Sequence, residues 1–154
     1  MKYRLINEDI KEKDLLDIIY ENRGITREQV DELLNANDEY KNPFEIFNMD
    51  KAKNLFKHIY NKDLIIGLLI DTDVDGFTSS TLLYQLLIKK IQHPKENIKI
   101  FKHTRAKAHG LSEDVFYDML KSDVNLWLIA DSSTNDKEQQ KKLSNKGMNV
   151  IILD

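Results

Sequence analysis

The chain has 154 residues, of which 41% are hydrophobic and 32% charged, so it is long enough to bury one sizeable core as a soluble domain. The absence of cysteine excludes disulfide frameworks, thiolate zinc sites and cysteine nucleophiles. A net charge of −3 argues against indiscriminate nucleic-acid binding, so a polyanionic partner would need a local basic patch or metal ions. Since no apolar stretch approaches the roughly 20 residues of a membrane helix, we expect a cytoplasmic protein without membrane contact.

Residues 1–62 are predicted to form a helical lead-in that packs on the core. An amphipathic pattern ends at Gly24, and Thr26 with Gln29 forms a capping-box pair ahead of the next apolar stripe. The pattern then breaks, and Asp50 is predicted to cap a third helix. The sequence therefore predicts a small helical layer before the main domain.

Residues 63–154 change to short apolar runs that alternate with amphipathic helices. Helices are expected after the first three runs, and the first helix is predicted to carry four leucines on one face. This alternation predicts an α/β fold: a parallel, Rossmann-like sheet in the strand order 2-1-3-4, with helices on both faces. Trp127, within the third run, is expected to lie in the core. The apolar runs are 64–70, 98–101, 125–130 and 150–153, and the four leucines are Leu82, Leu83, Leu86 and Leu87.

Three of the four apolar runs end in aspartate, at Asp71, Asp131 and Asp154. The carboxyl ends of parallel strands meet at one edge of a sheet, where such folds place their binding sites. We therefore expect these side chains to lie together with Asp73 and Asp75. A single aspartate at such a position is often a turn or cap residue. Clustered carboxylates, however, repel one another unless a cation lies among them, so the set predicts a magnesium or manganese site.

Two other interpretations of the segment after the first run were weighed. A calcium-binding EF-hand loop needs a bidentate acid where this chain has Leu82, and a helix where it has an apolar run. The EF-hand interpretation therefore fails. A haloacid-dehalogenase-type phosphatase needs threonine where the chain has Phe77, and its nucleophile directly at the strand end, two residues before Asp73. This phosphatase interpretation remains a minor alternative.

A third family accounts for more of the chain. The segment "DTDVDGFTSSTLLYQLL" resembles the first motif of the DHH phosphoesterases, in the form of the RecJ-type single-strand exonucleases. Upstream, "RGITREQVDELLN" and "NPFEIFNMDKAKNLFKHI" look like the helical lead-in of those exonucleases, with Asn42 and Pro43 in the place of Asp-Pro. Downstream, "RAKAHGL" is similar to the arginine-to-"GYGL" loop, "LIADSST" to the second motif, and "GMNVIILD" to the approach to the Asp-His-His signature. We therefore expect the N-terminal part of a DHH domain that ends on the signature's first residue.

The resemblance implies two divalent cations, Mn²⁺ or Mg²⁺, that bind a phosphodiester and generate the attacking hydroxide. By the same resemblance Asp73, Asp75 and Asp131 are the catalytic residues, the first two as direct metal ligands and Asp131 as a bridging ligand. Asp71 is implied as a ligand or as support for one. Asp154 is expected to orient a neighbouring histidine.

Substrate contacts are expected from two segments. Gly76 would let the backbone pass close to the site, and the polar run 78–80 would start a helix whose amides face anionic groups. The loop 102–110 after the second strand supplies cations. A solvated loop would show the same composition, so that alternative stays open, and its histidines are not assigned to metal. The predicted contacts are Gly76, Ser79, Arg105, Lys107 and His109.

The function implied by the resemblance is metal-dependent hydrolysis of single-stranded DNA by a RecJ-type exonuclease of DNA repair and recombination. A single-strand-binding protein or a helicase is the kind of protein partner expected. Alternative substrates in the family are oligonucleotides, cyclic dinucleotides and pyrophosphate, and a non-catalytic interaction module of the same fold is a further alternative. Because the family implies a signature histidine and an associated C-terminal domain beyond this chain, the chain alone is expected to be inactive and to bind metal weakly.

Overall fold

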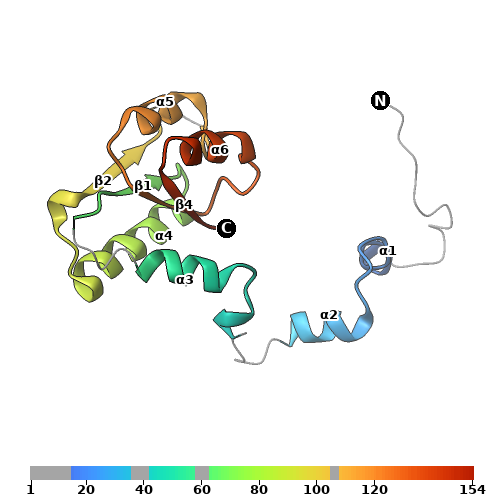
Figure 1. The fold of residues 1–154 in the computed structure, drawn as a ribbon. Helices are drawn as coiled ribbons and strands as arrows, with labels where there is room; N and C mark the ends of the chain where they lie inside the picture. The colour runs from blue at the N-terminus through green and yellow to red at the C-terminus, as the bar shows by residue number, and fades with distance from the viewer. Residues whose placement is uncertain (1–14, 36–41, 58–62, 105–107) are drawn as a thin grey trace. The chain divides into compact units, whose positions relative to one another are not determined.

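The computed structural model describes residues 15–35, 42–57, 63–104 and 108–154 (Figure 1), and the chain divides into two compact units, residues 1–46 and 47–154. The first unit contains α1 (Leu15–Asn22), α2 (Arg27–Leu34) and the short 3₁₀ helix η1 (Pro43–Glu45). At the start of α2 the Gln29 amide donates to the Thr26 hydroxyl at 3.3 Å, and the Thr26 amide donates to Gln29 Oε1 at 2.9 Å. The predicted capping box is therefore confirmed.

The second unit is built on a four-stranded parallel sheet with the strand order β2-β1-β3-β4. Ile66 of β1 lies opposite Ile98 of β2 and Leu126 of β3, so the three strands start in register. Both the parallel α/β fold and the strand order predicted from the sequence are confirmed. The strands are β1 (Ile66–Ile70), β2 (Ile98–Lys102), β3 (Leu126–Ala130) and β4 (Asn149–Leu153).

Helices cover both faces of this sheet, as alternating side chains on the buried strands require. On one face Ile66, Leu68 and their neighbours pack against α3, α4 and the π-helical segment η3. On the other face Leu69 and Trp127 pack against α5 and α6. The helical elements of this unit are α3 (Met49–Lys57), α4 (Val74–Gln85), η3 (Leu86–Ile91), η4 (Lys95–Asn97), α5 (Glu113–Lys121) and α6 (Lys137–Asn145).

The helix α3 contributes apolar side chains to the second unit, where Ala52, Leu55 and Phe56 pack on the core. It begins at Met49, so Asp50 lies in its first turn and is not the predicted cap. The domain boundary predicted at residue 62 stays a prediction, because residues 58–62 lie outside the described residues.

The helix after β1 differs from the sequence prediction in two ways. It begins at Val74 with Asp73 as its cap, so the prediction that the run 78–80 starts it was wrong. The four leucines also do not share one face: Leu82 is exposed while Leu87 is fully buried. With about 3.6 residues per turn, Leu82 and Leu86 lie on one side of the helix and are exposed, whereas Leu83 and Leu87 lie about 100° around it and pack on the core.

Trp127 is fully buried, as expected for a core residue, and its ring lies over β1. A Cβ atom at Gly67 would come within 2.4 Å of that ring, so only glycine leaves room for the indole across the neighbouring strand. Phe101 of β2 packs edge-on against the same ring, with centroids 4.9 Å apart. In the part of the chain that the structure describes, no helix has the length and apolarity needed to cross a bilayer.

Candidate metal centre

The carboxyl ends of β1, β3 and β4 place Asp71, Asp131 and Asp154 at the same edge of the sheet. Asp71 is 2% exposed, Asp131 is half-buried, and the chain continues from Asp71 through Asp73 into α4. The edge therefore gathers carboxylates from sequence positions more than 80 residues apart, as the strand pattern predicted.

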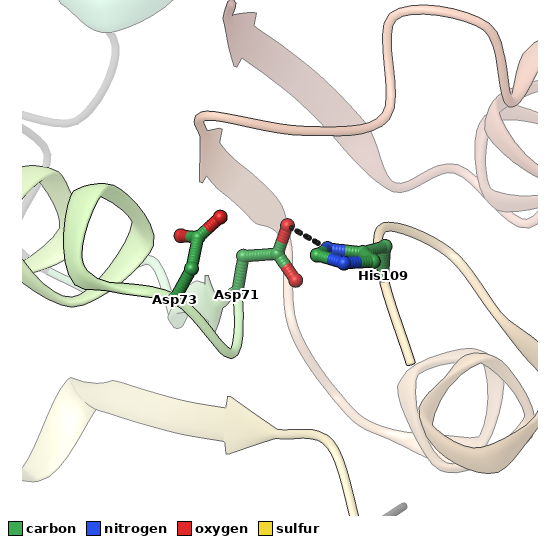
Figure 2. Close-up of side chains that lie close together, drawn as sticks. All are labelled: Asp71, Asp73 and His109. Carbon is green, nitrogen blue, oxygen red and sulfur yellow. Dashed lines mark hydrogen bonds and ion pairs between the residues drawn. The ribbon is translucent and has the colours of Figure 1, made fainter. Parts of the chain in front are cut away.

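Asp71 is the most enclosed of these carboxylates, and each of its oxygens has a partner. The Thr72 amide donates to Oδ1 at 2.9 Å, and Nδ1 of His109 lies 2.9 Å from Oδ2. Figure 2 shows the Asp71 carboxylate between His109 and Asp73, with the contact to His109 drawn. The Thr72 amide and the His109 ring thus each contact one oxygen of the carboxylate.

Asp73 caps α4, because its Oδ1 accepts a hydrogen bond from the Gly76 amide at 2.9 Å. A Cβ atom at Gly76 would lie 2.7 Å from the Asp71 Cβ and 2.9 Å from the Asp71 carbonyl oxygen. Glycine therefore lets the first turn of α4 pack directly on the end of β1. This agrees with the predicted close backbone approach, although the Gly76 amide donates to Asp73.

The surroundings of Asp131 raise the pKa of its carboxyl group. Burial raises the pKa of its carboxyl, and the charges of Asp73 and Asp75, a hydrogen bond with Asp73 and the charge of Asp154 raise it further. Its backbone is left-handed, with φ 65°, and its amide donates to the Leu153 carbonyl at 2.9 Å. The carboxylates of Asp73, Asp75 and Asp154 thus repel that of Asp131, and a bound cation would relieve this repulsion.

His109 completes the group of candidate ligands. One ligand atom from each of Asp71, Asp73 and His109 lies within 4.8 Å of the other two. The hydrogen bond to Asp71 and that residue's charge raise the pKa of the imidazole, helped by the charges of Asp73 and Asp131. Two carboxylate oxygens and an imidazole nitrogen are a donor set that fits Mn²⁺, and also Mg²⁺ where oxygen ligands dominate. The sequence analysis assigned His109 to substrate only, although its place after β2 put it at this edge.

Two pockets flank the carboxylates. A pocket of about 290 Å³ is lined by Asp71, His109, the loop 131–136 and Asp154. Another, of about 430 Å³, is lined on one side by α4 residues that include Asp75 and Ser79. The Ser79 hydroxyl donates to the Gly76 carbonyl at 3.2 Å, so it is partly engaged within its own helix. The predicted substrate contacts Arg105 and Lys107 lie outside the described residues.

The sequence analysis missed two groups of contacts that support this edge. Asp136 Oδ2 accepts from the Leu111 amide at 2.8 Å, and a Cβ atom at Gly110 would come within 2.5 Å of the same oxygen. This contact ties the loop after β3 to the loop after β2. His103 and Asp114 form the other group, next to Asp71. Each pairing joins residues at least ten positions apart in separate loops and helices, which no local pattern marks.

Together the fold and the site define a parallel α/β protein with an acidic, cation-compatible centre at the carboxyl edge of its sheet. Over its whole length the chain is 34% identical to a Bacillus subtilis (strain 168) protein described as "Putative SPbeta prophage-derived single-strand DNA-specific exonuclease YorK". It is equally similar to "Putative single-strand DNA-specific exonuclease yorK" of Bacillus phage SPbeta. The chain spans 25% of the length of each relative. The resemblance to single-strand exonucleases that the motifs indicated is therefore confirmed at the level of these relatives.

No model of a protein family matches the chain, and no solved structure matches it.

Proposed function

We propose that the chain is the N-terminal part of a metal-dependent nuclease of the DHH, RecJ-like type, which hydrolyses phosphodiester bonds in single-stranded DNA. The observation that carries this proposal is the convergence of Asp71, Asp73, Asp131 and His109 at one edge of the sheet. The printed descriptions of the two relatives support the choice of substrate.

Different residues at the edge would bind different divalent cations. Asp71, Asp73 and His109 offer ligand atoms for one cation, and Asp131 lies close enough to Asp73 to share a second. Asp75 and Asp154 add charge near Asp131, and all three residues line the same pocket. Bound divalent ions would neutralise the phosphodiester and lower the pKa of water. The protein's part is to keep repelling carboxylates fixed in place before the cations bind.

The substrate side of the proposal rests on the open pockets beside the carboxylates. The pocket along α4 carries hydroxyls of Thr78 and Ser79 next to Asp75, so a phosphodiester strand could pass along it once cations are bound. The loop with Arg105 and Lys107 remains the proposed source of contacts to the DNA backbone. A single-strand-binding protein or helicase as partner, action in repair or recombination, and a cytoplasmic location belong to the same proposal.

Calorimetry with Mn²⁺ tests the metal part on the 154-residue chain. We expect weak binding that is lost in Asp73→Asn and unchanged in Asp123→Asn, an exposed carboxylate paired with Lys99 that serves as matched control. Binding that survives both Asp73→Asn and Asp131→Asn would place the metal elsewhere and contradict the proposal.

The nuclease part is tested by release of mononucleotides from single- and double-stranded DNA, with Mn²⁺ and with a chelator. Because the relatives are much longer, the chain alone is expected to be inactive, and the assay is also run on a longer protein that contains it. There Asp75→Ala should abolish hydrolysis while single-strand binding persists. Activity that persists in chelator would refute metal dependence, and cleavage of cyclic dinucleotides or pyrophosphate in place of DNA would refute the substrate.

A further inference from the structure

A buried histidine, His103, lies next to Asp71. The side chain of His103 is fully buried, and its Nε2 lies 3.7 Å from Oδ1 of Asp71. Its other ring nitrogen, Nδ1, lies 3.2 Å from Oδ1 of Asp114 in the first turn of α5. The imidazole therefore bridges two carboxylates, one at the candidate metal centre and one at the start of a helix.

The carboxylate of Asp114 is itself held in place. Its Oδ2 accepts from the Thr104 amide at 2.9 Å, and its Oδ1 accepts from the Ser112 hydroxyl at 2.6 Å. Thr104 lies in the loop after β2, and Ser112 is the residue just before α5. Both segments therefore hold Asp114 in place, and Asp114 in turn holds the ring of His103. A ring held in this way has one orientation toward Asp71.

The distance between Nε2 of His103 and Oδ1 of Asp71 is slightly longer than a hydrogen bond. Nε2 of His103 is buried and has no hydrogen-bond partner within the described ranges, and Oδ1 of Asp71 lies 3.7 Å from it. Buried polar atoms rarely stay unpaired without a reason. Contacts of this kind are often long in a free protein and tighten when the site is filled.

We propose that His103 and Asp114 form a positioning pair that holds the Asp71 carboxylate in the orientation needed to receive a cation. This inference rests on the proposed metal-dependent function, because it assigns Asp71 its support within that site. The arrangement leaves Oδ2 of Asp71 in contact with His109, and both residues line the pocket beside the loop 131–136. It is the arrangement expected where an outer carboxylate and an imidazole orient a ligand from behind.

Two substitutions at one position separate the positioning role from a packing role. The amide nitrogen of glutamine reaches about as far as Nε2 of histidine, whereas that of asparagine reaches only as far as Nδ1. We expect His103→Asn to weaken Mn²⁺ binding by about 10-fold or more. His103→Gln should keep most of the affinity, because its amide nitrogen can occupy the place of Nε2 beside Asp71.

His93 provides the matched control. It is also buried, at 3% exposure, and it also has an unpartnered ring nitrogen, but its Nε2 lies 2.9 Å from the Leu64 carbonyl, before β1. The substitutions His93→Asn and His93→Gln should lower the thermal stability and leave Mn²⁺ affinity unchanged. If the two His103 variants match the His93 variants in Mn²⁺ affinity, the inference is overturned.

A second measurement needs no metal and therefore separates this inference from the proposed function. The side-chain carboxyl carbon of Asp71 is followed by NMR in the metal-free chain. Its resonance should shift or broaden in His103→Asn and stay close to that of the unmutated chain in His103→Gln. Neither His93 substitution should change it. Failure of the unmutated chain to bind Mn²⁺ would refute the metal proposal, whereas an Asp71 resonance unchanged in His103→Asn would refute the positioning pair.

Discussion

The polar groups at the two edges of the parallel sheet differ in how they are paired. At the amino edge the backbone groups find partners: the Ile65 amide donates to the side-chain Oδ1 of Asn125 at 2.8 Å, and the backbone amide of Asn125 donates to the Ile65 carbonyl at 2.8 Å. His93 lies at the same edge with Nε2 2.9 Å from the Leu64 carbonyl. These contacts give backbone amides and carbonyls a hydrogen-bond partner, as a folded domain requires.

The carboxyl edge accumulates like charges and unusual backbone. Asp131 and Ser133 are both left-handed, with φ of 65° and 78°, in a loop where neither residue is glycine. The pKa of the Asp131 carboxyl is raised chiefly by burial and then by its acidic neighbours. Strained backbone and repelling charges lower stability, so they point to a role other than folding. The comparison therefore supports the proposed ligand site at the carboxyl edge, whereas the amino edge contributes to the stability of the fold.

The largest expected effect comes from neutralising the centre of the charged edge. Asp131→Asn should weaken Mn²⁺ binding by about 10- to 100-fold and should raise the Tm of the metal-free chain, because it removes repulsion. Asparagine adopts the left-handed backbone readily, so the loop should persist. Calorimetry and thermal melts check both changes, with Asp123→Asn as control. A lower Tm together with unchanged affinity would break the comparison.

Gly76→Ala should have the next largest effect. The added methyl would lie 2.7 Å from the Asp71 Cβ, and forcing it into this packed contact should cost about 1–3 kcal/mol of the free energy of unfolding. Mn²⁺ affinity should fall as well, since Asp71 must move. Chemical denaturation followed by circular dichroism measures the first effect. Thr81→Ala, an exposed change on the same helix, should leave both quantities nearly unchanged.

A change at the amino edge should affect stability alone. Asn125→Ala removes the acceptor of the Ile65 amide and should cost about 1 kcal/mol of the free energy of unfolding. Asn125→Asp keeps an acceptor oxygen there and should cost less. Mn²⁺ affinity should be the same in both variants. A loss of affinity at this distance from the carboxylates would show that the two edges are coupled.

The smallest expected effect is a dependence of metal-free stability on pH. Asp71 raises the pKa of His109 above its ordinary 6.5, so the folded chain binds that proton more tightly than the unfolded chain. The stabilisation is complete below about 6.5 and is lost as the pH rises through the raised value. Asp131, whose pKa is also raised, acts in the same direction at lower pH. Thermal melts across this range should show the decline, and His109→Gln should flatten its upper part.

The sheet could be predicted because its strands are short apolar runs, buried on both faces, that end at recognisable polar residues. The aspartates at the strand ends could be placed at one edge for the same reason. The start of α4 was misplaced because Asp73 was interpreted only as a ligand, whereas its carboxylate also caps the helix. The exposure of Leu82 was missed because the leucine pattern alone does not show which side of the helix faces the sheet.

The contacts that hold the site residues in place could not be predicted from the sequence for a different reason. The contacts of His103 with Asp71 and Asp114 depend on how the loop after β2 folds back onto β1, which residue spacing does not determine. The contact of His109 with Asp71 depends on the same loop. The metal-binding roles of the aspartates remain predictions that rest on their convergence.

The indole that lies over Gly67 makes the second unit separately observable. Trp127 is the chain's one tryptophan, and it is fully enclosed between the sheet and the helices of its unit. Emission excited at the red edge of protein absorption therefore comes from the interior of residues 47–154, and residues 1–46 contribute no tryptophan signal. Comparing this emission with far-ultraviolet circular dichroism, which sums all helices, would reveal whether the two units melt in one transition or two.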